Sequence, residues 1–411
     1  MKILFLNAYF YPEKIAFSHL ERDLIEELVI AGNEIEILCP IPTRGISQEK
    51  IREYKNIKNQ NFMNGKIKVT RFWAPQEGNK ILMRVFRYLW CNFKHYSLGK
   101  KYKDCDLIFS VSTPPTQGLI AGKLAKKLKI PHLYLLQDIF PDSLINAKMT
   151  KEGSLLWLIG RKMENYTYKN ADKIVVINNT MRKNIIAKKV EKNKIEVISN
   201  WINIKNVYEV PKEKNSLFKK YNLSIKNFNI VYAGNFGVAQ GAEIIFKIAE
   251  MLGEYSDIKF IIFGGGIYFE KIKEKNQNKE NILINELLPL EYVSEVYSLG
   301  NIALITCKKG TSLASMPSKT WSIMACNTPI IASFDKNSEL ENILNDSGAG
   351  YCVEAGNVNE LYKAILSEYK KFKNNEIKSI NTREYVKKHA TKQKCVKEYV
   401  DLCKKIIEKK V

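Results

Sequence analysis

Three glycines follow an apolar run in the second half of the chain and precede a helix-like stretch. They are Gly234, Gly237 and Gly241, within VYAGNFGVAQGAE (residues 231–243). Glycines let a phosphate approach the backbone closely, and a helix start presents free N–H groups to an anion. The spacing fits neither the dinucleotide-binding nor the P-loop pattern. The loop also lacks lysine and arginine, so it predicts a phosphate site whose positive charge comes from elsewhere.

A lysine near a later helix start is the candidate source of that charge. In SMPSKTWSIMACN (315–327), Ser318 stands at the N-cap position and Lys319 in the first turn. The helix dipole disfavours a cation at that end, and an anion held by Lys319 and the free amides would offset the cost. A surface lysine beside an ordinary N-cap is the alternative. A third junction, IIFGGG (261–266), also runs from a strand into a helix.

Two series of alternating apolar strands and amphipathic helices must position these loops. The first series runs from residue 2 to 199, and the second restarts at Phe228. Apolar strands separated by helices indicate a parallel sheet covered on both faces. We therefore predict an α/β protein with two doubly wound parallel-sheet domains that face an interdomain cleft, where such sheets bind ligands beyond their strand ends. The expected domains are 1–203 and 204–383, with a last helix, 384–411, packing back on the first.

Composition narrows the class of protein. The 411 residues are 45% hydrophobic, which excludes a disordered chain, and their net charge is +22. The eight cysteines form no C-x-x-C pair, so a metal or disulfide framework is not expected. The expected location is a reducing cytosol. We interpret the N-terminal apolar run as a buried strand rather than a signal peptide. No stretch has the ~18 apolar residues of a membrane span.

Much of the positive charge lies in one region. Residues 51–103 hold 13 Lys and Arg against two acidic residues. Within it, 81–103 places Leu82, Val85, Phe86, Leu89 and Phe93 on one helical face, with basic and aromatic residues elsewhere. This pattern suits a helix lying on an anionic membrane surface. Stacking on nucleic-acid bases and a core-facing helix with a solvated basic face are the alternatives.

Several motifs together carry a family resemblance. In order they are YFYPE, AGNEIEILCPIPTRG, VSTPPTQGLIAGKLAKKLKIPHLYLLQDIFPDS, VISNWIN, YAGNFGVAQG, IIFGGG, MPSKTWSIMACNTPIIAS and SGAGYCVEAGN. The set resembles glycosyltransferase family 4, whose fold is GT-B with two Rossmann-like domains, and within it the WbuB-like branch of O-antigen and capsule sugar transferases of the N-acetyl-L-fucosamine transferase type. The resemblance covers residues 1 to about 370.

The resemblance implies a retaining, metal-independent hexosyltransferase or N-acetylhexosaminyltransferase without cofactor. It would move a sugar, an N-acetylhexosamine or a deoxy derivative, from a UDP-sugar to a polyprenyl-diphosphate-linked oligosaccharide on the inner face of the cytoplasmic membrane, and nucleic acid is not an expected partner. Asp138 and Lys319 are the expected catalytic residues, and His19 and Arg44 the acceptor-side ones. The expected donor-binding residues are Gly234, Asn235, Gly237, Gln240, Gly264, Gly265, Gly266, Glu286, Lys309, Ser318, Lys319 and Glu339.

The chain departs from the family pattern at two places. Asn235 and Gln240 stand where the family commonly has two cations, and Ala314 and Ser322 replace the glutamates of its Glu-x7-Glu motif. Ser318 and Lys319 are therefore the expected diphosphate ligands, with Lys308 or Lys309 adding charge.

Asp138 has two interpretations. At the end of strand HLYLLQD it can orient the acceptor hydroxyl or the donor sugar, or it can cap the turn before Pro141. Two rival functions also remain at the level of sequence: a UDP-sugar 2-epimerase of the same fold and a basic nucleic-acid-binding protein. The epimerase needs acid and base groups in its site, and a chain with four histidines gives this function little support. A nucleic-acid-binding protein predicts an affinity that falls steeply with salt concentration.

Overall fold

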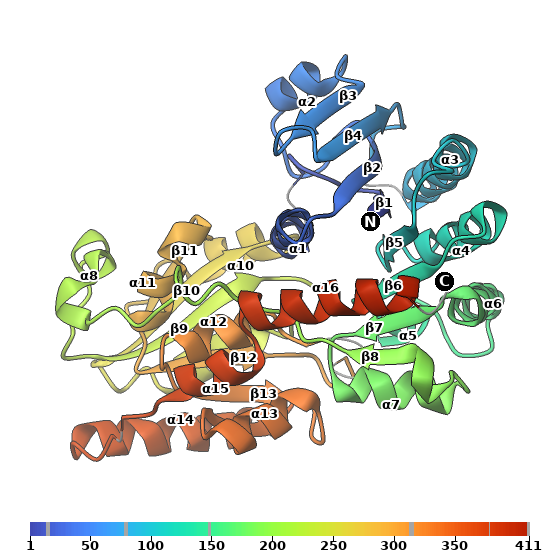
Figure 1. Ribbon diagram of the computed structural model, residues 1–411. Helices are drawn as coiled ribbons and strands as arrows, with labels where there is room; N and C mark the ends of the chain where they lie inside the picture. The colour runs from blue at the N-terminus through green and yellow to red at the C-terminus, as the bar shows by residue number, and fades with distance from the viewer. Residues whose placement is uncertain (14–16, 78–80, 147–148, 312–315, 378, 409–411) are drawn as a thin grey trace. The chain divides into compact units, whose positions relative to one another are not determined.

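The computed structural model describes residues 1–13, 17–77, 81–146, 149–311, 316–377 and 379–408. The chain forms two compact units, one made of Met1–Ser199 with the chain from Gln393 onward, the other of Asn200–Lys392. Each unit is built on one mainly parallel sheet with helices (Figure 1). The prediction of two parallel-sheet α/β units is confirmed. The units divide after Ser199 and after Lys392, whereas the expected boundaries were 203 and 383.

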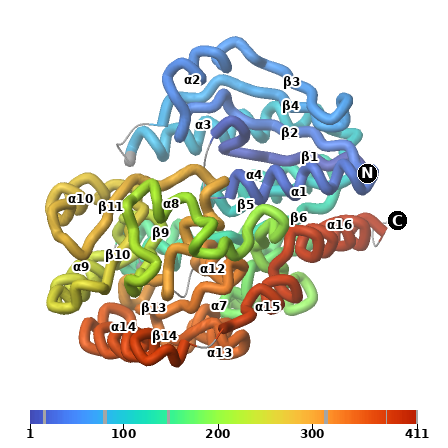
Figure 2. Tube along the Cα trace, turned by 90° about the vertical axis from the view of Figure 1, so that its left-hand side faces the viewer, coloured from blue at the N-terminus to red at the C-terminus, as the bar shows by residue number. Residues whose placement is uncertain are grey.

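The N-terminal unit carries a sheet whose strand order is β3-β4-β2-β1-β5-β6-β7-β8 within the described chain. Figure 2 shows β3, β4, β2 and β1 lying in that order. All neighbours pair in parallel except β3 and β4. Its elements are β1 Lys2–Leu6, α1 Ser18–Ile30, β2 Glu34–Pro40, α2 Gln48–Tyr54, β3 Asn59–Phe62, β4 Ile67–Phe72, α3 Ile81–Gly99, β5 Leu107–Val111, α4 Gln117–Leu128, β6 His132–Leu136, α5 Asp142–Asn146, α6 Leu155–Asn170, β7 Lys173–Val176, α7 Asn179–Ala187, β8 Ile195–Val197 and α16 Lys392–Glu408.

The C-terminal unit carries a parallel sheet in the order β11-β10-β9-β12-β13-β14 among the residues described. Its elements are α8 Ser216–Lys220, β9 Phe228–Asn235, α9 Glu243–Met251, β10 Ile258–Gly265, α10 Phe269–Asn276, β11 Ile282–Glu286, α11 Val293–Ser298, β12 Ile302–Thr306, α12 Lys319–Ala325, β13 Ile330–Phe334, α13 Glu339–Ser347, β14 Gly350–Glu354, α14 Val358–Lys373 and α15 Thr382–His389. Short 3-10 turns cover Lys192–Lys194, Lys212–Lys214 and Leu290–Tyr292.

The two faces of this second sheet bury two separate apolar clusters. Because side chains alternate along a strand, Val231 packs into one cluster, whereas Ile230 and Tyr232 pack into the other. Trp321 and Met324 of α12 join the first cluster. The position of α12 beside the end of β12 is therefore fixed by apolar packing, and that packing places Lys319 at the carboxyl edge of the sheet.

The last helical region is divided into two helices rather than the single helix predicted over 384–411. The division falls at Ala390 and Thr391, where Ala390 O accepts a hydrogen bond from Ile202 N at 2.9 Å and Thr391 bridges to Ile202. This strand-like contact takes the backbone out of the helix. Beyond it, α16 belongs to the N-terminal unit, where the Tyr399 ring lies 6.3 Å from the Phe109 ring.

Arg383 anchors α15 within the C-terminal unit. Its guanidinium group donates hydrogen bonds to three backbone carbonyls, those of Val207 at 2.6 Å, Ala325 at 2.9 Å and Ile204. We expect Arg383→Ala to lower the free energy of unfolding by ~2–4 kcal/mol, because these partly buried carbonyls lose charged donors. Urea denaturation of the variant measures this change.

The matched control for that experiment is Lys387→Ala on the same helix. Lys387 makes an exposed ion pair with Glu384 at 2.6 Å, so its removal should change the free energy of unfolding by less than ~0.5 kcal/mol. Equal effects of the two substitutions would show that Arg383 does not anchor the helix.

Candidate functional site

The glycine loop after β9 is held between the loops that follow β10 and β12. Phe236 N donates to Gly265 O at 2.6 Å on one side, and Lys308 N donates to Ala239 O at 2.8 Å on the other. Gly241 has a φ of +55°, and a Cβ there would lie 3.0 Å from the Cys307 carbonyl. Since these bonds are between backbone groups, the loop keeps its shape without help from a ligand.

The Asn235 side chain lies close to two glycines at this edge of the sheet. A Cβ on Gly266, whose φ is +103°, would lie 1.9 Å from Asn235 Oδ1, and a Cβ on Gly237 would lie 2.9 Å from Asn235 Nδ2. The same Gly237 position lies 2.7 Å from Gln240 Oε1. The Asn235 side chain is exposed. The structure thus brings four of the predicted residues, Gly237, Gly266, Asn235 and Gln240, into one surface of glycine backbone and side-chain amides.

Lys319 lies directly against this loop. Its Nζ is 4.0 Å from the centre of the Tyr232 ring, and a Cβ added to Gly234 would lie 2.6 Å from it. A side chain at position 234 would displace the ammonium group from this place, so glycine leaves room for it. In the described residues, no carboxylate lies within ion-pair distance of Lys319 and no hydrogen bond of its Nζ is formed. Among the described residues, the ammonium group makes a cation–π contact with the Tyr232 ring.

Burial alone lowers the pKa of Lys319 to about 7. A charged ammonium removed from water is costly unless an anion or hydrogen-bond acceptors replace the lost hydration. A bound anion would restore the charged form. The described residues supply no anion for Lys319.

Other predicted donor-binding residues have protein partners. Lys309 forms an ion pair with Glu354 at the end of β14, and Glu286 lies 3.9 Å from Lys273. Glu339 begins α13 after its N-cap Ser338. Ser318 occupies the N-cap position of α12, but its side chain makes no capping bond and is exposed. The predicted N-cap position of Ser318 is confirmed, but the side chain forms no capping bond, since its backbone is already helical at φ −60° and ψ −27°.

Two of the glycines in IIFGGG are explained by packing. A Cβ on Gly264 would lie 2.4 Å from the Phe236 ring and 2.5 Å from the Phe269 ring, and one on Gly265 would lie 3.3 Å from Leu287. The close ring contacts at Gly264 require a residue without a side chain. Packing alone explains why Gly264 is a glycine. Its role in donor binding therefore stays a prediction.

The predicted acceptor-side residues lie in loops that follow strands of the first sheet. Asp138 follows β6 with an exposed side chain, and its N–H donates to Ser112 Oγ at 3.3 Å. His19 is exposed in the first turn of α1. Arg44 is held in place by protein groups: its N–H donates to Glu13 at 2.9 Å, and its guanidinium group lies 3.5 Å from Glu77.

Sequence reasoning missed Tyr232, whose ring lies under the Lys319 ammonium group. The alternation of the strand offered a signal, because it places Tyr232 and Gly234 on the same face. It also missed two buried polar residues, Asn7 directly after β1 and Glu21 in the first turn of α1. Ala314, one of the two positions of the missing glutamate motif, lies outside the described residues.

Lys319→Met tests the cost of the buried ammonium group. Because the folded pKa of about 7 lies below the ordinary value of 10.5, the unfolded chain binds more protons between those pH values. The free energy of unfolding of the parent therefore rises with pH across that window. Methionine keeps the stem packing without charge, so the variant should be more stable by ~3 kcal/mol at pH 6, with the advantage shrinking towards pH 10.

Urea denaturation of parent and variant at several pH values measures that difference. A gap between the two proteins that does not change between pH 6 and pH 10 would contradict a buried, unpaired Lys319.

Two family models match the chain, one over each unit. The model described as Glycosyltransferase Family 4 matches residues 22–206, and the one described as Glycosyl transferases group 1 matches residues 213–393. Together they cover the greater part of the sequence. This pairing agrees with the two parallel-sheet units.

Relatives and solved structures agree with the family models. WbjE of Pseudomonas aeruginosa, named as a glycosyltransferase, is 25% identical over 276 residues, which are 66% of this chain and 68% of that protein. WcaI of Escherichia coli K12, named as a colanic acid biosynthesis glycosyl transferase, is 22% identical over 414 residues, covering 98% and 99% of the two chains.

Among solved structures, a sucrose-phosphate synthase from Thermosynechococcus elongatus superposes with a TM-score of 0.76 at 16% identity, over 99% of each chain. HepE of Anabaena in complex with UDP has a TM-score of 0.70 at 14% identity, over 98% of this chain and 100% of that one. At these identities the structures show the fold alone, which is GT-B. The chain therefore belongs to the glycosyltransferases that join a Family 4 domain to a group 1 domain, and it is a transferase of that family.

Proposed function

We propose that this glycosyltransferase moves a sugar with retention from a UDP-sugar to a lipid-linked oligosaccharide in bacterial surface polysaccharide synthesis, of O-antigen or capsule type. The names of two relatives support the process, because WcaI is named for colanic acid biosynthesis and WbjE as a glycosyltransferase. The UDP complex of HepE supports the nucleotide. The motifs that resemble the WbuB-like branch favour an N-acetylhexosamine or a deoxy derivative as the sugar.

One observation carries the proposal most directly: the Lys319 ammonium group lies against Gly234 and the Tyr232 ring, and no carboxylate of the described residues pairs with it. A nucleoside diphosphate is the anion that fits a glycine loop at the carboxyl edge of a parallel sheet. In this proposal Lys319 supplies the positive charge. Asn235 and Gln240 supply amide hydrogen bonds where the family commonly has cations.

The proposed reaction needs neither metal nor cofactor. The bond between the anomeric carbon and the diphosphate oxygen breaks with its electron pair on the phosphate, and the acceptor oxygen forms the new bond on the same face. The departing diphosphate takes the acceptor proton. Lys319 stabilises the charge that develops on the leaving group, which is electrostatic catalysis, while Asp138 orients the acceptor hydroxyl or the donor sugar.

The proposed membrane contact is the outer face of α3. This helix buries polar groups and exposes apolar ones, the reverse of an ordinary surface helix. Arg87 and His95 are fully buried, with Arg87 donating to Pro75 O and the His95 ring 3.1 Å from Asn7 O. The exposed apolar side chains are those of Leu82, Met83, Val85, Phe86, Leu89 and Phe93. The apolar side chains that would face the core in the alternative interpretation are exposed instead, and this supports the proposed membrane contact.

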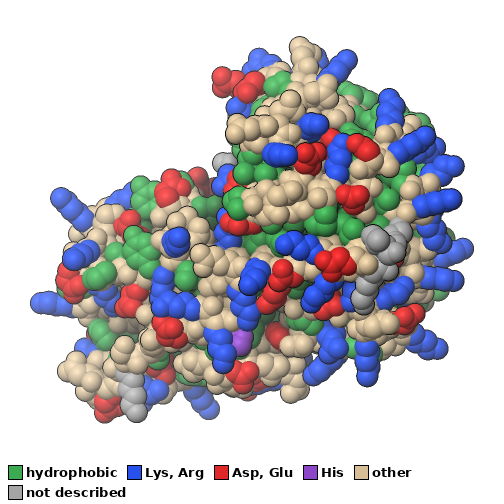
Figure 3. All heavy atoms as spheres, viewed as in Figure 1, with side chains coloured by type: hydrophobic (Ala, Val, Ile, Leu, Met, Phe, Trp, Pro, Cys, Tyr) green, Lys and Arg blue, Asp and Glu red, His purple; other side chains and the backbone are tan. Residues whose placement is uncertain are grey.

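Neighbouring helices extend the surface and add positive charge. Helix α4 contacts both α3 and α6, and α6 exposes Leu155, Leu156, Leu158 and Ile159 near its start. Exposed lysines lie beside them at positions 100, 101, 123, 126, 127 and 162. Figure 3 shows Lys and Arg side chains gathered along the edge where α3, α4 and α6 lie. Apolar side chains between cations suit an anionic lipid surface. None of the helices in the described residues combines the length and apolarity that crossing a bilayer requires.

UDP binding tests the donor site. We expect the parent to bind UDP and Lys319→Met to bind it ~10- to 100-fold more weakly at pH 7, because the diphosphate loses its buried charged partner. The control is Lys309→Ala, which removes an exposed lysine already paired with Glu354 and should change Kd less than ~3-fold. Isothermal calorimetry with UDP, GDP and ADP gives these values.

Failure of the parent to bind any of the three nucleotides would overturn the proposed function. Equal weakening by both substitutions would overturn the assignment of Lys319. Formation of an epimer from the UDP-sugar without an acceptor would favour the epimerase instead.

Vesicle binding tests the membrane contact. The double substitution Phe86→Ser with Phe93→Ser should weaken co-sedimentation with phosphatidylglycerol vesicles more than ~10-fold, since each buried aromatic ring contributes ~1.5–3 kcal/mol. The control pair, Ile30→Ser with Leu290→Ser, changes exposed apolar residues on other helices and turns and should have little effect. Unchanged binding of the α3 variant would contradict the proposed contact, and salt-sensitive binding to DNA or RNA would favour the rival function.

A further inference from the structure

A tyrosine near the end of β9 contacts both the lysine and the glycine loop of the proposed donor site. Tyr232 is 1% exposed, and its ring packs in the apolar cluster on one face of the second sheet, 5.3 Å from the Phe236 ring. The centre of the ring lies 4.0 Å from Lys319 Nζ, and the hydroxyl group bonds to the backbone of Asn235. One side chain therefore connects the lysine of α12 to the start of the glycine loop.

The peptide group between residues 235 and 236 is fixed on both sides. Tyr232 Oη donates a hydrogen bond to Asn235 O at 3.2 Å, and Phe236 N donates to Gly265 O at 2.6 Å. The first bond is made within β9, and the second joins the chain to the neighbouring strand β10. Because the exposed Asn235 side chain projects from this part of the backbone, its direction depends on both bonds.

The Tyr232 ring attracts the ammonium group without carrying a charge of its own. The face of an aromatic ring attracts a cation within about 6 Å of its centre, and more strongly where water is excluded. Burial raises the pKa of the Tyr232 hydroxyl, with a smaller contribution from Glu243 of α9, so the phenol stays neutral. A neutral ring holds the Lys319 ammonium group in place and leaves its charge for an anionic ligand.

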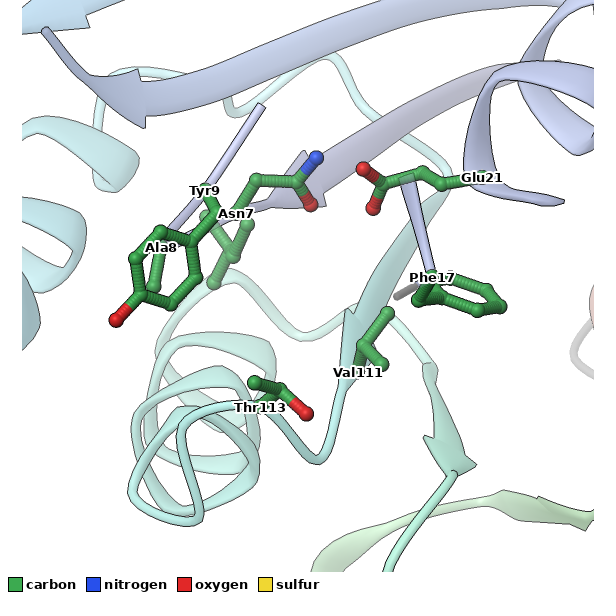
Figure 4. Close-up of a pocket in the computed structure, with 8 residues that line it drawn as sticks. Asn7, Ala8, Tyr9, Phe17, Glu21, Val111 and Thr113 are labelled. Atoms are coloured by element: carbon green, nitrogen blue, oxygen red, sulfur yellow. The ribbon is translucent and has the colours of Figure 1, made fainter. Parts of the chain in front are cut away.

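A buried tyrosine of the first unit shows a different arrangement. The guanidinium carbon of Arg44 lies 5.3 Å from the centre of the Tyr9 ring, and the Tyr9 hydroxyl group donates to Glu77 at 2.9 Å. Arg44 also lies 3.5 Å from Glu77. The Tyr9 ring points away from Glu21 (Figure 4), so Glu77 is the carboxylate that serves this cation. Within the described part of the chain, Lys319 has no such carboxylate.

We propose that Tyr232 is a positioning residue for the donor diphosphate. Its ring holds the Lys319 ammonium group against Gly234, and its hydroxyl group fixes the peptide beside the Asn235 amide. The proposal rests on the proposed function and adds the residue that sets the geometry of its charged and amide ligands. Tyr232 acts through these residues, since its own side chain is buried.

Two substitutions of Tyr232 separate the ring from the hydroxyl group. Tyr232→Phe keeps the ring and removes one hydrogen bond, so UDP should bind ~2- to 10-fold more weakly. Tyr232→Leu removes the ring as well, and UDP should bind ~10- to 100-fold more weakly. Calorimetry at pH 7 gives both dissociation constants, and a melting curve shows that each variant is folded.

The pH dependence of UDP binding distinguishes positioning from a purely structural role. The ring favours the charged form of Lys319, whose pKa burial lowers to about 7. Without the ring, Lys319 should lose its proton at lower pH. The fall in UDP affinity with rising pH should therefore begin ~0.5–1 pH unit lower in Tyr232→Leu than in the parent. It should begin at the parent's pH in Tyr232→Phe, which keeps the ring.

The control is Tyr369→Leu, beside the start of β9 in the same apolar cluster. Tyr369 is 8% exposed, its ring lies 5.7 Å from the Phe228 ring, and its hydroxyl group donates to Asp257 at 2.6 Å. This variant also loses a buried ring and a hydroxyl bond, but Lys319 keeps its contacts. It should lower the melting temperature and leave UDP affinity and its pH dependence unchanged.

NMR of the parent chain tests the contact without a substitution at Tyr232. With carbon-13-labelled lysine, the ε-methylene signal of Lys319 should lie upfield of the exposed lysines, because the face of the Tyr232 ring shields it. Lys319→Met identifies the signal by its loss. The signal should stay upfield after UDP is added, because the ring still holds the ammonium group beside the bound diphosphate.

Three results would overturn the proposal and leave the proposed function standing. The first is a Tyr232→Leu protein whose UDP affinity begins to fall at the same pH as that of the parent. The second is a parent whose Lys319 signal is not shifted upfield. The third is a signal that moves to the position of the exposed lysines when UDP binds. A parent that binds no UDP would instead contradict the proposed function.

Discussion

The buried ammonium group of Lys319 is the physical constraint on which the proposed donor site depends. It lies over the Tyr232 ring and against Gly234, and burial lowers its pKa to about 7. A cation in that position weakens the fold unless an anion joins it. The apolar packing of Trp321 and Met324 holds α12 in place nonetheless. In the proposed donor site, a bound anion would stabilise the charged form of Lys319, for which the described residues supply no carboxylate.

The loop that surrounds Lys319 in the proposed site is fixed by its neighbours in the structure. Backbone hydrogen bonds tie residues 236 and 239 to the neighbouring loops, and the Asn235 amide fills the space beside Gly237 and Gly266. A preformed set of dipoles costs no reorganisation when charge develops on a leaving group. One buried lysine with fixed amides can therefore replace a pair of cations, although the replacement makes binding sensitive to the protonation of that lysine.

Much of the fold could be predicted from periodicity, because buried parallel strands are continuous apolar runs. The exceptions have physical causes. The polar sequence NQNF forms β3 at the sheet edge, where half its side chains are exposed and no apolar pattern exists. The candidate site was predictable where its residues stood at strand-to-helix junctions, as the glycine loop after β9 and Lys319 after β12 each do. Gly264, Asn7 and Glu21 were not, since their surroundings are assembled from residues distant in sequence.

Proton uptake on UDP binding tests the central claim most directly. At pH 8 the free Lys319 side chain is mostly neutral, given a pKa of about 7, and the phosphates of UDP are already ionised, since their last pKa is near 6. Binding should charge Lys319 and draw close to one proton from the buffer. Calorimetry in buffers of different ionisation enthalpy measures that number. Uptake of about one proton by the parent, lost in Lys319→Met, is the predicted result, whereas UDP binding by the parent without proton uptake would contradict the account.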